Sequence, residues 1–258
     1  MSFISITFWV AFIVFFIVFL LLQHQNWRKV MLGYVLIFSL IFAYTSNGLL
    51  TLLLPLTAFA SWGLTRWMNR CQAIGKKKCV LALTIFVTLL PLLYYKYTNF
   101  LLDTLGSLLH SNFAPLDLIQ PLGISFYTFQ ALSYAIDTYR GQMPPRVNLL
   151  EYTFTISFFP TLMAGPITRP NYLIPQLRRP MGVSRTCVYT GLWLIIVGLV
   201  KKAVISDYIA QYNTWIFEAP ANYSGFENAM GVLGFSLQVY LDFSGYSDIA
   251  IGPAALLG

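Results

Sequence analysis

Long apolar runs separated by short polar stretches dominate this chain and predict a bundle of membrane-spanning helices. The first run, from Phe3 to Leu22, contains no charged residue and is 20 residues long, enough at about 1.5 Å per residue to cross a hydrocarbon core of about 30 Å. We expect further helices over 31–45, 48–66, 79–97, 121–140, 186–200 and 228–243. The pattern therefore predicts an all-α polytopic transmembrane protein that forms a single domain over residues 1–258.

One apolar stretch, from Tyr152 to Met163, is too short to span a membrane comfortably. It contains Pro160, it is followed by Ala164-Gly165-Pro166, and arginines flank it on both sides. Irregular backbone at membrane depth is tolerated only where it is buried in protein or lines a water-filled cavity. We expect a re-entrant segment, which enters the membrane and leaves on the same side.

Composition and charge support the membrane assignment. Apolar residues make up 57% of the chain and charged residues 10%, whereas charged residues average about 25% in soluble domains. The net charge of +7 comes from basic clusters between apolar runs, and the positive-inside rule places the clusters at 23–30 and 66–78 in the cytoplasm. The N-terminus and the loops at 99–120 and 207–227, which contain no Lys or Arg, are then outside. No basic patch has the pattern of a nucleic-acid site.

The three cysteines, Cys71, Cys79 and Cys187, form no CxxC pair and have no metal-binding spacing with His24 or His110. We therefore expect free thiols and no metal site. The sequence also contains no Gly-rich phosphate loop and no GxSxG motif, which argues against a kinase or a serine hydrolase.

The segment 240–248 carries the most informative polar residues, which are Asp242, Ser244, Tyr246 and Asp248. An ionisable side chain at membrane depth costs about 2.5–3.5 kcal/mol on insertion scales, so a functional role is its first interpretation. Asp242 and Asp248 are six residues apart and would lie on nearly opposite sides of a regular helix. If the helix unwinds at Gly245, both carboxylates can face one cavity. The alternative is that they pair with arginine or cap helix ends.

Three motifs together resemble the membrane-bound O-acyltransferase family, most closely its alginate O-acetyltransferase branch. They are Pro121-Leu-Gly-Ile-Ser-Phe-Tyr-Thr-Phe-Gln130, the run from Phe158-Phe-Pro to Ile167-Thr-Arg169-Pro, and the 242–248 segment. The resemblance implies an enzyme of the cytoplasmic (inner) membrane that moves an acetyl group from a cytoplasmic donor, acetyl-CoA or an acyl carrier, toward a secreted polysaccharide. It also implies an extracytoplasmic acetyltransferase or polysaccharide-export partner, and no bound cofactor.

Within this resemblance, Gln130 and the polar residues of 242–248 are candidates for the wall of a substrate tunnel, although such residues more often bond neighbouring helices. Arg140 and Arg169 are candidates for the mouth through which the donor enters, since a guanidinium suits phosphate contacts. Their alternatives are an ion pair between Asp137 and Arg140 within one helix, and a cytoplasmic anchor for Arg169.

The catalytic histidine of the family lies in the later half of a longer protein, and neither His24 nor His110 matches it. The resemblance therefore predicts that this chain corresponds to the N-terminal half of such an enzyme, contains no catalytic residue and is inactive alone. Two other classes remain open, a transporter or flippase, which would show an inverted repeat, and a non-catalytic membrane scaffold.

Overall fold

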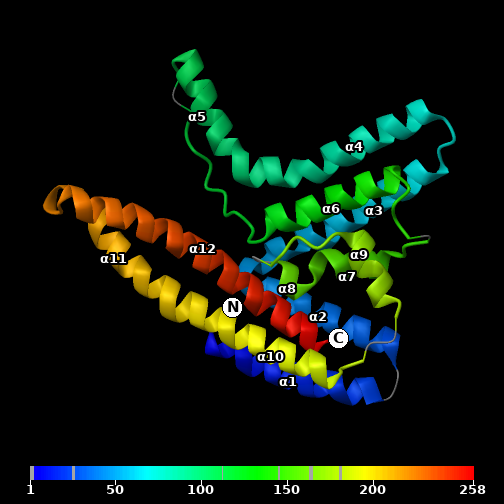
Figure 1. The fold of residues 1–258 in the computed structure, drawn as a ribbon. Helices are drawn as coiled ribbons and strands as arrows, with labels where there is room; N and C mark the ends of the chain where they lie inside the picture. The colour runs from blue at the N-terminus through cyan, green and yellow to red at the C-terminus, as the bar shows by residue number, and fades with distance from the viewer. Residues whose placement is uncertain (1–2, 25–26, 112, 145, 163–164, 180–181) are drawn as a thin grey trace. The chain divides into compact units, whose positions relative to one another are not determined.

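The computed structural model describes residues 3–24, 27–111, 113–144, 146–162, 165–179 and 182–258, and over these residues the chain is helical and contains no strand (Figure 1). Four helical stretches are long and apolar enough to cross a membrane, namely Ile6–Gln23, Lys29–Arg70, Ile74–Leu109 and Arg185–Glu218. The prediction of an all-α polytopic membrane protein is confirmed. The chain divides into two compact units. Unit 1 is Met1–Asn26, Ala164–Pro166 and Met181–Gly258, and unit 2 is Trp27–Met163 and Ile167–Pro180.

Unit 2 packs its helices around a core of aromatic and aliphatic side chains. Its elements are α2 (Arg28–Asn47), the 3-10 helix η1 (Gly48–Leu52), α3 (Leu53–Arg70), α4 (Ile74–Leu92), the π-helical turn η2 (Leu93–Tyr97), α5 (Thr98–Leu109), α6 (Ile124–Tyr139), α7 (Leu149–Ser157), α8 (Phe159–Leu162) and α9 (Pro170–Leu177). At its centre the rings of Tyr134 and Tyr152 have centroids 4.0 Å apart. The Tyr152 hydroxyl hydrogen-bonds the Ser61 hydroxyl at 2.8 Å, which satisfies a polar group that is fully buried.

The predicted helix boundaries in unit 2 are correct in part. The break between the second and third apolar helices is confirmed at Gly48, where φ is +55° and a residue with a side chain would be strained. The predicted loop over 99–120 is wrong in its first half, because α4 continues through η2 into α5 and ends only at Leu109. The absence of Lys and Arg there reflected an apolar helix, not a loop. α6 begins at Ile124 and not at Pro121.

The stretch predicted to re-enter the membrane forms two short helices. α7 is nine residues long, which corresponds to about 14 Å, roughly half a hydrocarbon core. The chain leaves helical geometry at Phe158, whose φ and ψ are −57° and 114°, and α8 contains Pro160. The expected break at Ala164 lies outside the described residues. The predicted short and interrupted helix is present, and re-entry itself stays a prediction.

Unit 1 consists of long helices. Its elements are α1 (Ile6–His24), α10 (Arg185–Leu199), the π-helical turn η3 (Val200–Ser206), α11 (Asp207–Glu218), the 3-10 helix η4 (Pro220–Asn222) and α12 (Gly225–Leu256). One sequence prediction is wrong here. The helix predicted over 186–200 continues through Lys201 and Lys202 to Glu218, so most of the predicted 207–227 loop is helical. α12 runs without interruption past Gly245, so the condition under which both carboxylates would face one cavity is not met.

Candidate functional site

The polar residues of the 240–248 segment lie on α12 where this helix packs against α10 and η3. The helices approach most closely at two pairs of glycines. A Cβ atom placed on Gly198 would lie 2.7 Å from the Gly245 carbonyl oxygen, and one placed on Gly191 would lie 2.8 Å from the Gly252 carbonyl oxygen. Glycines at this spacing let two backbones touch in a membrane. Because the backbones touch, the side chains of η3 reach α12 directly.

Lys201 of η3 is bound to two of the residues singled out in the sequence. Its Nζ donates to Asp248 Oδ2 at 2.6 Å and to Ser244 Oγ at 3.0 Å. The side chains of Lys201 and Asp248 are 29% and 18% exposed, so this charge pair is largely shielded. One ammonium group therefore fixes both a carboxylate and a hydroxyl on one face of α12.

Lys202 is bound to the remaining two residues of the segment. Its Nζ forms ion pairs with Asp207 Oδ1 at 2.8 Å and with the Asp242 carboxylate. The same Nζ lies 5.5 Å from the centroid of the Tyr246 ring, a distance at which a cation and an aromatic face attract each other. Four of the five candidate tunnel residues thus gather around two adjacent lysines.

The π-helical geometry of η3 is part of this arrangement. Successive residues of a regular α-helix point about 100° apart, and a π-helical turn adds a residue to the turn and changes that direction locally. Lys201 and Lys202 both lie inside η3, and both meet α12. Turns of this kind occur frequently at functional sites, which adds weight to a role for the cluster.

Two further polar contacts join η3 and α11 to α12 beyond the lysine cluster. The Ser206 hydroxyl, which is buried, donates to the Gln238 carbonyl oxygen at 3.1 Å. The Asn213 amide donates to Gln238 Oε1 at 2.8 Å. α11 and α12 are therefore joined by hydrogen bonds as well as by apolar packing, as is typical of helices within a membrane.

The two interpretations of Asp242 and Asp248 can now be compared with the structure. Among the described residues neither carboxylate pairs with arginine, because Asp242 pairs with Lys202 and Asp248 with Lys201, and both lysines belong to η3. Both acids lie inside α12 and not at its ends. The condition that α12 unwinds at Gly245 is not met, since the helix continues and Gly245 is in close contact with Gly198. The pairing leaves three carboxylates facing two ammonium groups, so the cluster carries a formal charge of −1 when all are ionised. A role in a substrate site remains a proposal.

Gln130, the fifth candidate, lies on α6 in unit 2. Its side chain is 1% exposed, and neither of its amide atoms has a hydrogen-bond partner among the described residues. The same holds for Ser133 Oγ and Asp137 Oδ2 on the same helix. Buried polar groups without partners are uncommon in native proteins and call for an explanation such as bound water or a ligand. α6 therefore carries a buried stripe of unused hydrogen-bonding groups.

The two arginines proposed for the donor mouth are both exposed. Arg140 follows the last residue of α6, and Arg169 precedes the first residue of α9. The expected ion pair between Asp137 and Arg140 is wrong, since none is present among the described residues. Asp137 lies on the buried face of α6 while Arg140 lies beyond its end, so the i, i+3 geometry of a continuous helix does not apply.

The residues of this cluster that the sequence analysis did not single out are the lysines themselves. Lys201 and Lys202 follow directly after the helix predicted over 186–200 and were given no role in the site. A signal was available, because residues 203–258 contain five acids and no Lys or Arg. Acids within apolar helices need counter-charges, and these two lysines are the nearest cations before that acidic region.

The cluster can position groups, but it contains no histidine to transfer protons near neutral pH. Its ammonium groups can stabilise negative charge on an oxygen, and its hydroxyls can orient a polar substrate. Among the described residues, no group of three His, Cys, Asp or Glu side chains is arranged to hold a metal ion. The geometry thus suits binding and orientation of a polar group at membrane depth.

Comparison with known proteins adds an independent line of evidence. No protein-family model and no solved structure matches the chain. A probable alginate O-acetylase AlgI of Pseudomonas aeruginosa is 37% identical over 183 residues, which are 69% of this chain and 35% of the relative. A probable alginate O-acetylase AlgI of Pseudomonas syringae pv. tomato is 33% identical over 247 residues, 92% of this chain and 46% of the relative. The peptidoglycan O-acetyltransferase of Helicobacter pylori is 32% identical over 211 residues, 72% of this chain and 40% of the relative.

These matches confirm the resemblance inferred from the three motifs. The chain is related to bacterial O-acetyltransferases over most of its own length, and it spans between 35% and 46% of the length of these three relatives.

Proposed function

We propose that this chain, as a relative of the membrane-bound O-acyltransferases, takes part in moving an acetyl group across the membrane to a hydroxyl of a secreted polysaccharide or of peptidoglycan. The observation that carries the proposal is the sequence relationship to alginate O-acetylases and to a peptidoglycan O-acetyltransferase. The integral membrane character of the chain agrees with it. A transporter is not favoured, because no relative of that class is among the matches described above.

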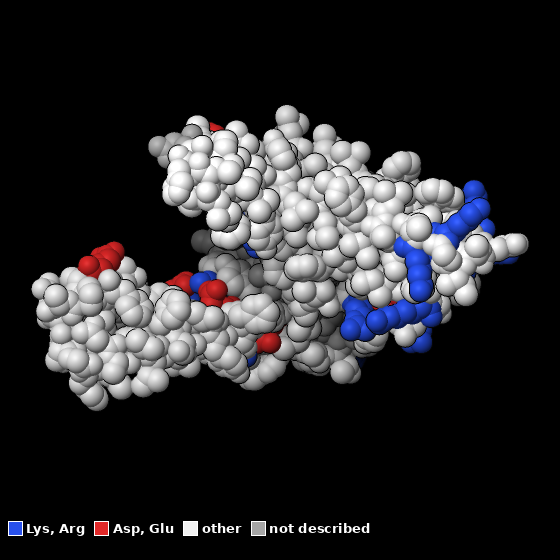
Figure 2. All heavy atoms as spheres, turned by 90° about the horizontal axis from the view of Figure 1, so that it is seen from above, with Lys and Arg blue, Asp and Glu red and all other residues white. Residues whose placement is uncertain are grey.

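The donor and partners belong to the proposal as well. An acyl donor is required by any acyltransferase, and we propose acetyl-CoA or an acyl carrier on the cytoplasmic side. We further propose the cytoplasmic (inner) membrane as the location, with an extracytoplasmic acetyltransferase or a polysaccharide-export protein as the partner. The basic residues at one end of unit 2 support a cytoplasmic donor, because the positive-inside rule assigns that end to the cytoplasm (Figure 2).

The residues of this chain would contribute orientation to the reaction. Attack of a hydroxyl on a thioester needs a general base, usually a histidine. The resemblance places that histidine in the later half of the family's longer proteins, and neither His24 nor His110 corresponds to it. Lys201 fixes Ser244 and Asp248, and Lys202 does the same for Asp242 and Tyr246. We assign these residues to holding a polar acceptor or a developing oxyanion.

Gln130 has a related role in this proposal. Its amide is buried and has no partner among the described residues, so it is available to a ligand. We propose that it contacts an acyl carbonyl or a sugar hydroxyl, and that Arg140 and Arg169 contact the phosphates of the donor.

The test uses two serines of α12 in the gene at its native locus. Ser244→Ala removes the hydroxyl bound to Lys201, whereas Ser236→Ala removes an exposed hydroxyl that bonds only to its own helix, at the Val232 carbonyl. Ester-linked acetate is released by mild alkali from the secreted polysaccharide and the cell wall and then quantified. We expect Ser244→Ala to lower the acetate about tenfold or more, as loss of a transition-state donor does, with membrane levels of the protein unchanged. Ser236→Ala should leave acetate unchanged. Normal acetate in both fractions after deletion of the gene would rule out the proposed function.

A further inference from the structure

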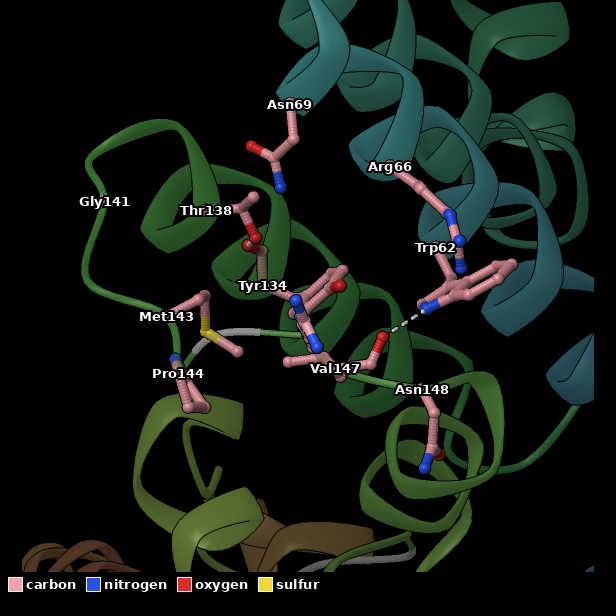
Figure 3. Close-up of a pocket in the computed structure, with 11 residues that line it drawn as sticks. Trp62, Arg66, Asn69, Tyr134, Thr138, Gly141, Met143, Pro144, Val147 and Asn148 are labelled. Carbon is pink, nitrogen blue, oxygen red and sulfur yellow. Dashed lines mark hydrogen bonds between the residues drawn. The ribbon is translucent and has the colours of Figure 1, made fainter.

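A second polar site lies in unit 2, at the end where α3 and α6 terminate. A cavity of about 520 Å³ opens there between the two helix ends and residues from 141–144 and 146–148. Figure 3 shows Trp62, Arg66 and Asn69 of α3 on one side, with Tyr134 and Thr138 of α6 forming the floor. Met143, Pro144, Arg146, Val147 and Asn148 complete the wall. We refer to this cavity as the Arg66 pocket.

The walls of the Arg66 pocket are held in place by hydrogen bonds. Trp62 Nε1 donates to the Val147 carbonyl oxygen at 3.0 Å, the bond drawn in Figure 3. Arg178 donates to the Arg146 carbonyl oxygen at 3.2 Å. Asn148 begins α7 through a capping box with Glu151. Residues 146–148 are therefore tied to α3, α7 and the end of α9, which fixes this wall of the pocket.

Backbone geometry at Arg146 also points to a special role for this segment. Its φ is +55°, in the left-handed region that residues other than Gly, Asn and Asp seldom adopt. Such conformations persist only where surrounding contacts impose them, and they are frequent at ligand-binding sites. Here the Arg146 carbonyl oxygen accepts a hydrogen bond from Arg178, so this residue is held by a neighbour outside its own segment.

The charge of the pocket is positive and not neutralised. Arg66 lies with its guanidinium carbon 5.1 Å from the centroid of the Trp62 ring, and neither Arg66 nor Arg146 forms an ion pair with any described residue. The nearest acid in sequence, Glu151, is occupied by Arg178, which contacts Oε1 at 3.1 Å and Oε2 at 2.9 Å. Both carboxylate oxygens of Glu151 are therefore used by Arg178, and the Glu151 hydrogen bonds raise the pKa of Arg178 above its usual value.

The surroundings strengthen the positive potential. Figure 2 shows Lys and Arg side chains gathered at the end of unit 2 where α3 passes into α4 and α6 passes toward α7. Two unpaired guanidinium groups, a side-chain amide from Asn69 and an indole wall form a set of donors without a competing acid. Arginine donors in this arrangement match the oxygens of a phosphate group.

We propose that the Arg66 pocket binds the phosphate group of a phosphate ester. Two sources have this chemistry at a membrane surface, a phospholipid headgroup and a soluble phosphate ester. The pocket lies outside the Lys201 and Lys202 cluster and is built from different elements, so the proposal does not rest on the acyl-transfer function.

The experiment measures binding to the purified full chain in detergent by native mass spectrometry. Dioctanoyl phosphatidylglycerol represents the headgroup, dioctanoylglycerol is its phosphate-free counterpart, and adenosine 3′,5′-bisphosphate represents a soluble ester. The double variant Arg66→Gln, Arg146→Gln removes both guanidinium groups. The matched control is Arg70→Gln with Lys76→Gln, two charges at the same end of unit 2 that do not line the pocket.

We expect one of the phosphate probes to bind the wild-type chain and dioctanoylglycerol not to bind. The pocket variant should weaken that binding about tenfold or more, corresponding to loss of at least one charge-assisted hydrogen bond, and the control should change it less than about twofold. Preference for the lipid or for the bisphosphate identifies the source. If the double variant does not fold, Arg66→Lys tests the same point, because it keeps the charge and removes the planar fork, and it should weaken binding measurably. The proposal is overturned if neither phosphate probe binds, or if the control variant weakens binding as much as the pocket variant.

Discussion

Removal of the Asp248 carboxylate should destabilise unit 1 through Lys201. Asp248→Asn leaves the ammonium group of Lys201 without a counter-charge, because the acceptor at 2.6 Å loses its negative charge and only neutral oxygens remain as partners. Exposed ion pairs contribute about 0–1 kcal/mol, whereas removing one partner of a buried pair costs about 3–5 kcal/mol. With side chains 29% and 18% exposed, this pair lies between the two cases, and we expect a loss of about 1–3 kcal/mol.

The assay is a double-mutant cycle on the free energy of unfolding of the purified chain in detergent micelles. Its members are wild type, Asp248→Asn, Lys201→Met and the double variant. The double variant should lose less than the sum of the single variants, with a coupling energy of about 1–2 kcal/mol. Asp207→Asn is the control, because Asp207 is 46% exposed and Lys202 keeps Asp242 as a partner, so it should cost about 0–1 kcal/mol.

Two results would refute this reasoning. A coupling energy below about 0.3 kcal/mol, the usual limit of additivity for independent sites, would mean that the two side chains do not interact. An Asp207→Asn variant as unstable as Asp248→Asn would mean that exposure does not distinguish the pairs.

Two further predictions concern the helix contacts and the topology. Gly198→Ala should destabilise unit 1 by about 1–3 kcal/mol, as overpacking does, because the added Cβ would lie 2.7 Å from the Gly245 carbonyl oxygen. Gly33→Ala is the control: the space around Gly33 is open, so thermal stability should stay unchanged or rise. Equal effects of the two substitutions on thermal stability would contradict the close contact at Gly198. In a chain whose Cys71, Cys79 and Cys187 are replaced by Ser, an impermeant thiol reagent added from outside should label Ser111→Cys and not Gly75→Cys, and the opposite pattern would invert the proposed topology.

Much of the fold was predictable because apolar runs and charge clusters report directly on burial in a membrane. The break at Gly48 and the interrupted stretch near Pro160 were both visible as residues that disfavour a continuous helix. The errors occurred where a charged or polar residue was taken as the end of a helix. The helices predicted to end at 97 and 200 both continue, the second through Lys201 and Lys202, because a lysine that finds a partner does not need to leave the helix.

The candidate site was predictable in its residues and not in its partners. Asp242 and Asp248 stood out because acids are expensive in apolar surroundings, but their counter-charges lie at Lys202 and Lys201, which are 40 and 47 residues earlier in the chain. The close glycine contacts between α10 and α12 help to bring the two segments together. The Arg66 pocket could not be predicted from the sequence for a similar reason. Arg66 and Arg146 are 80 residues apart in the chain, and each resembles an ordinary basic residue of a cytoplasmic loop.

The pairing pattern of the two lysines has a consequence for biogenesis. During synthesis, α10, η3 and α11 reach the bilayer before α12 exists, and an uncompensated lysine costs about 2.5–3.5 kcal/mol at its centre. Lys202 carries its counter-charge with it, because Asp207 belongs to the same helical stretch and pairs with it at 2.8 Å. Lys201 depends on Ser244 and Asp248, which are made later. We therefore expect the segment 185–218 to reach its full depth only when α12 joins it, so that the two enter the membrane as a hairpin.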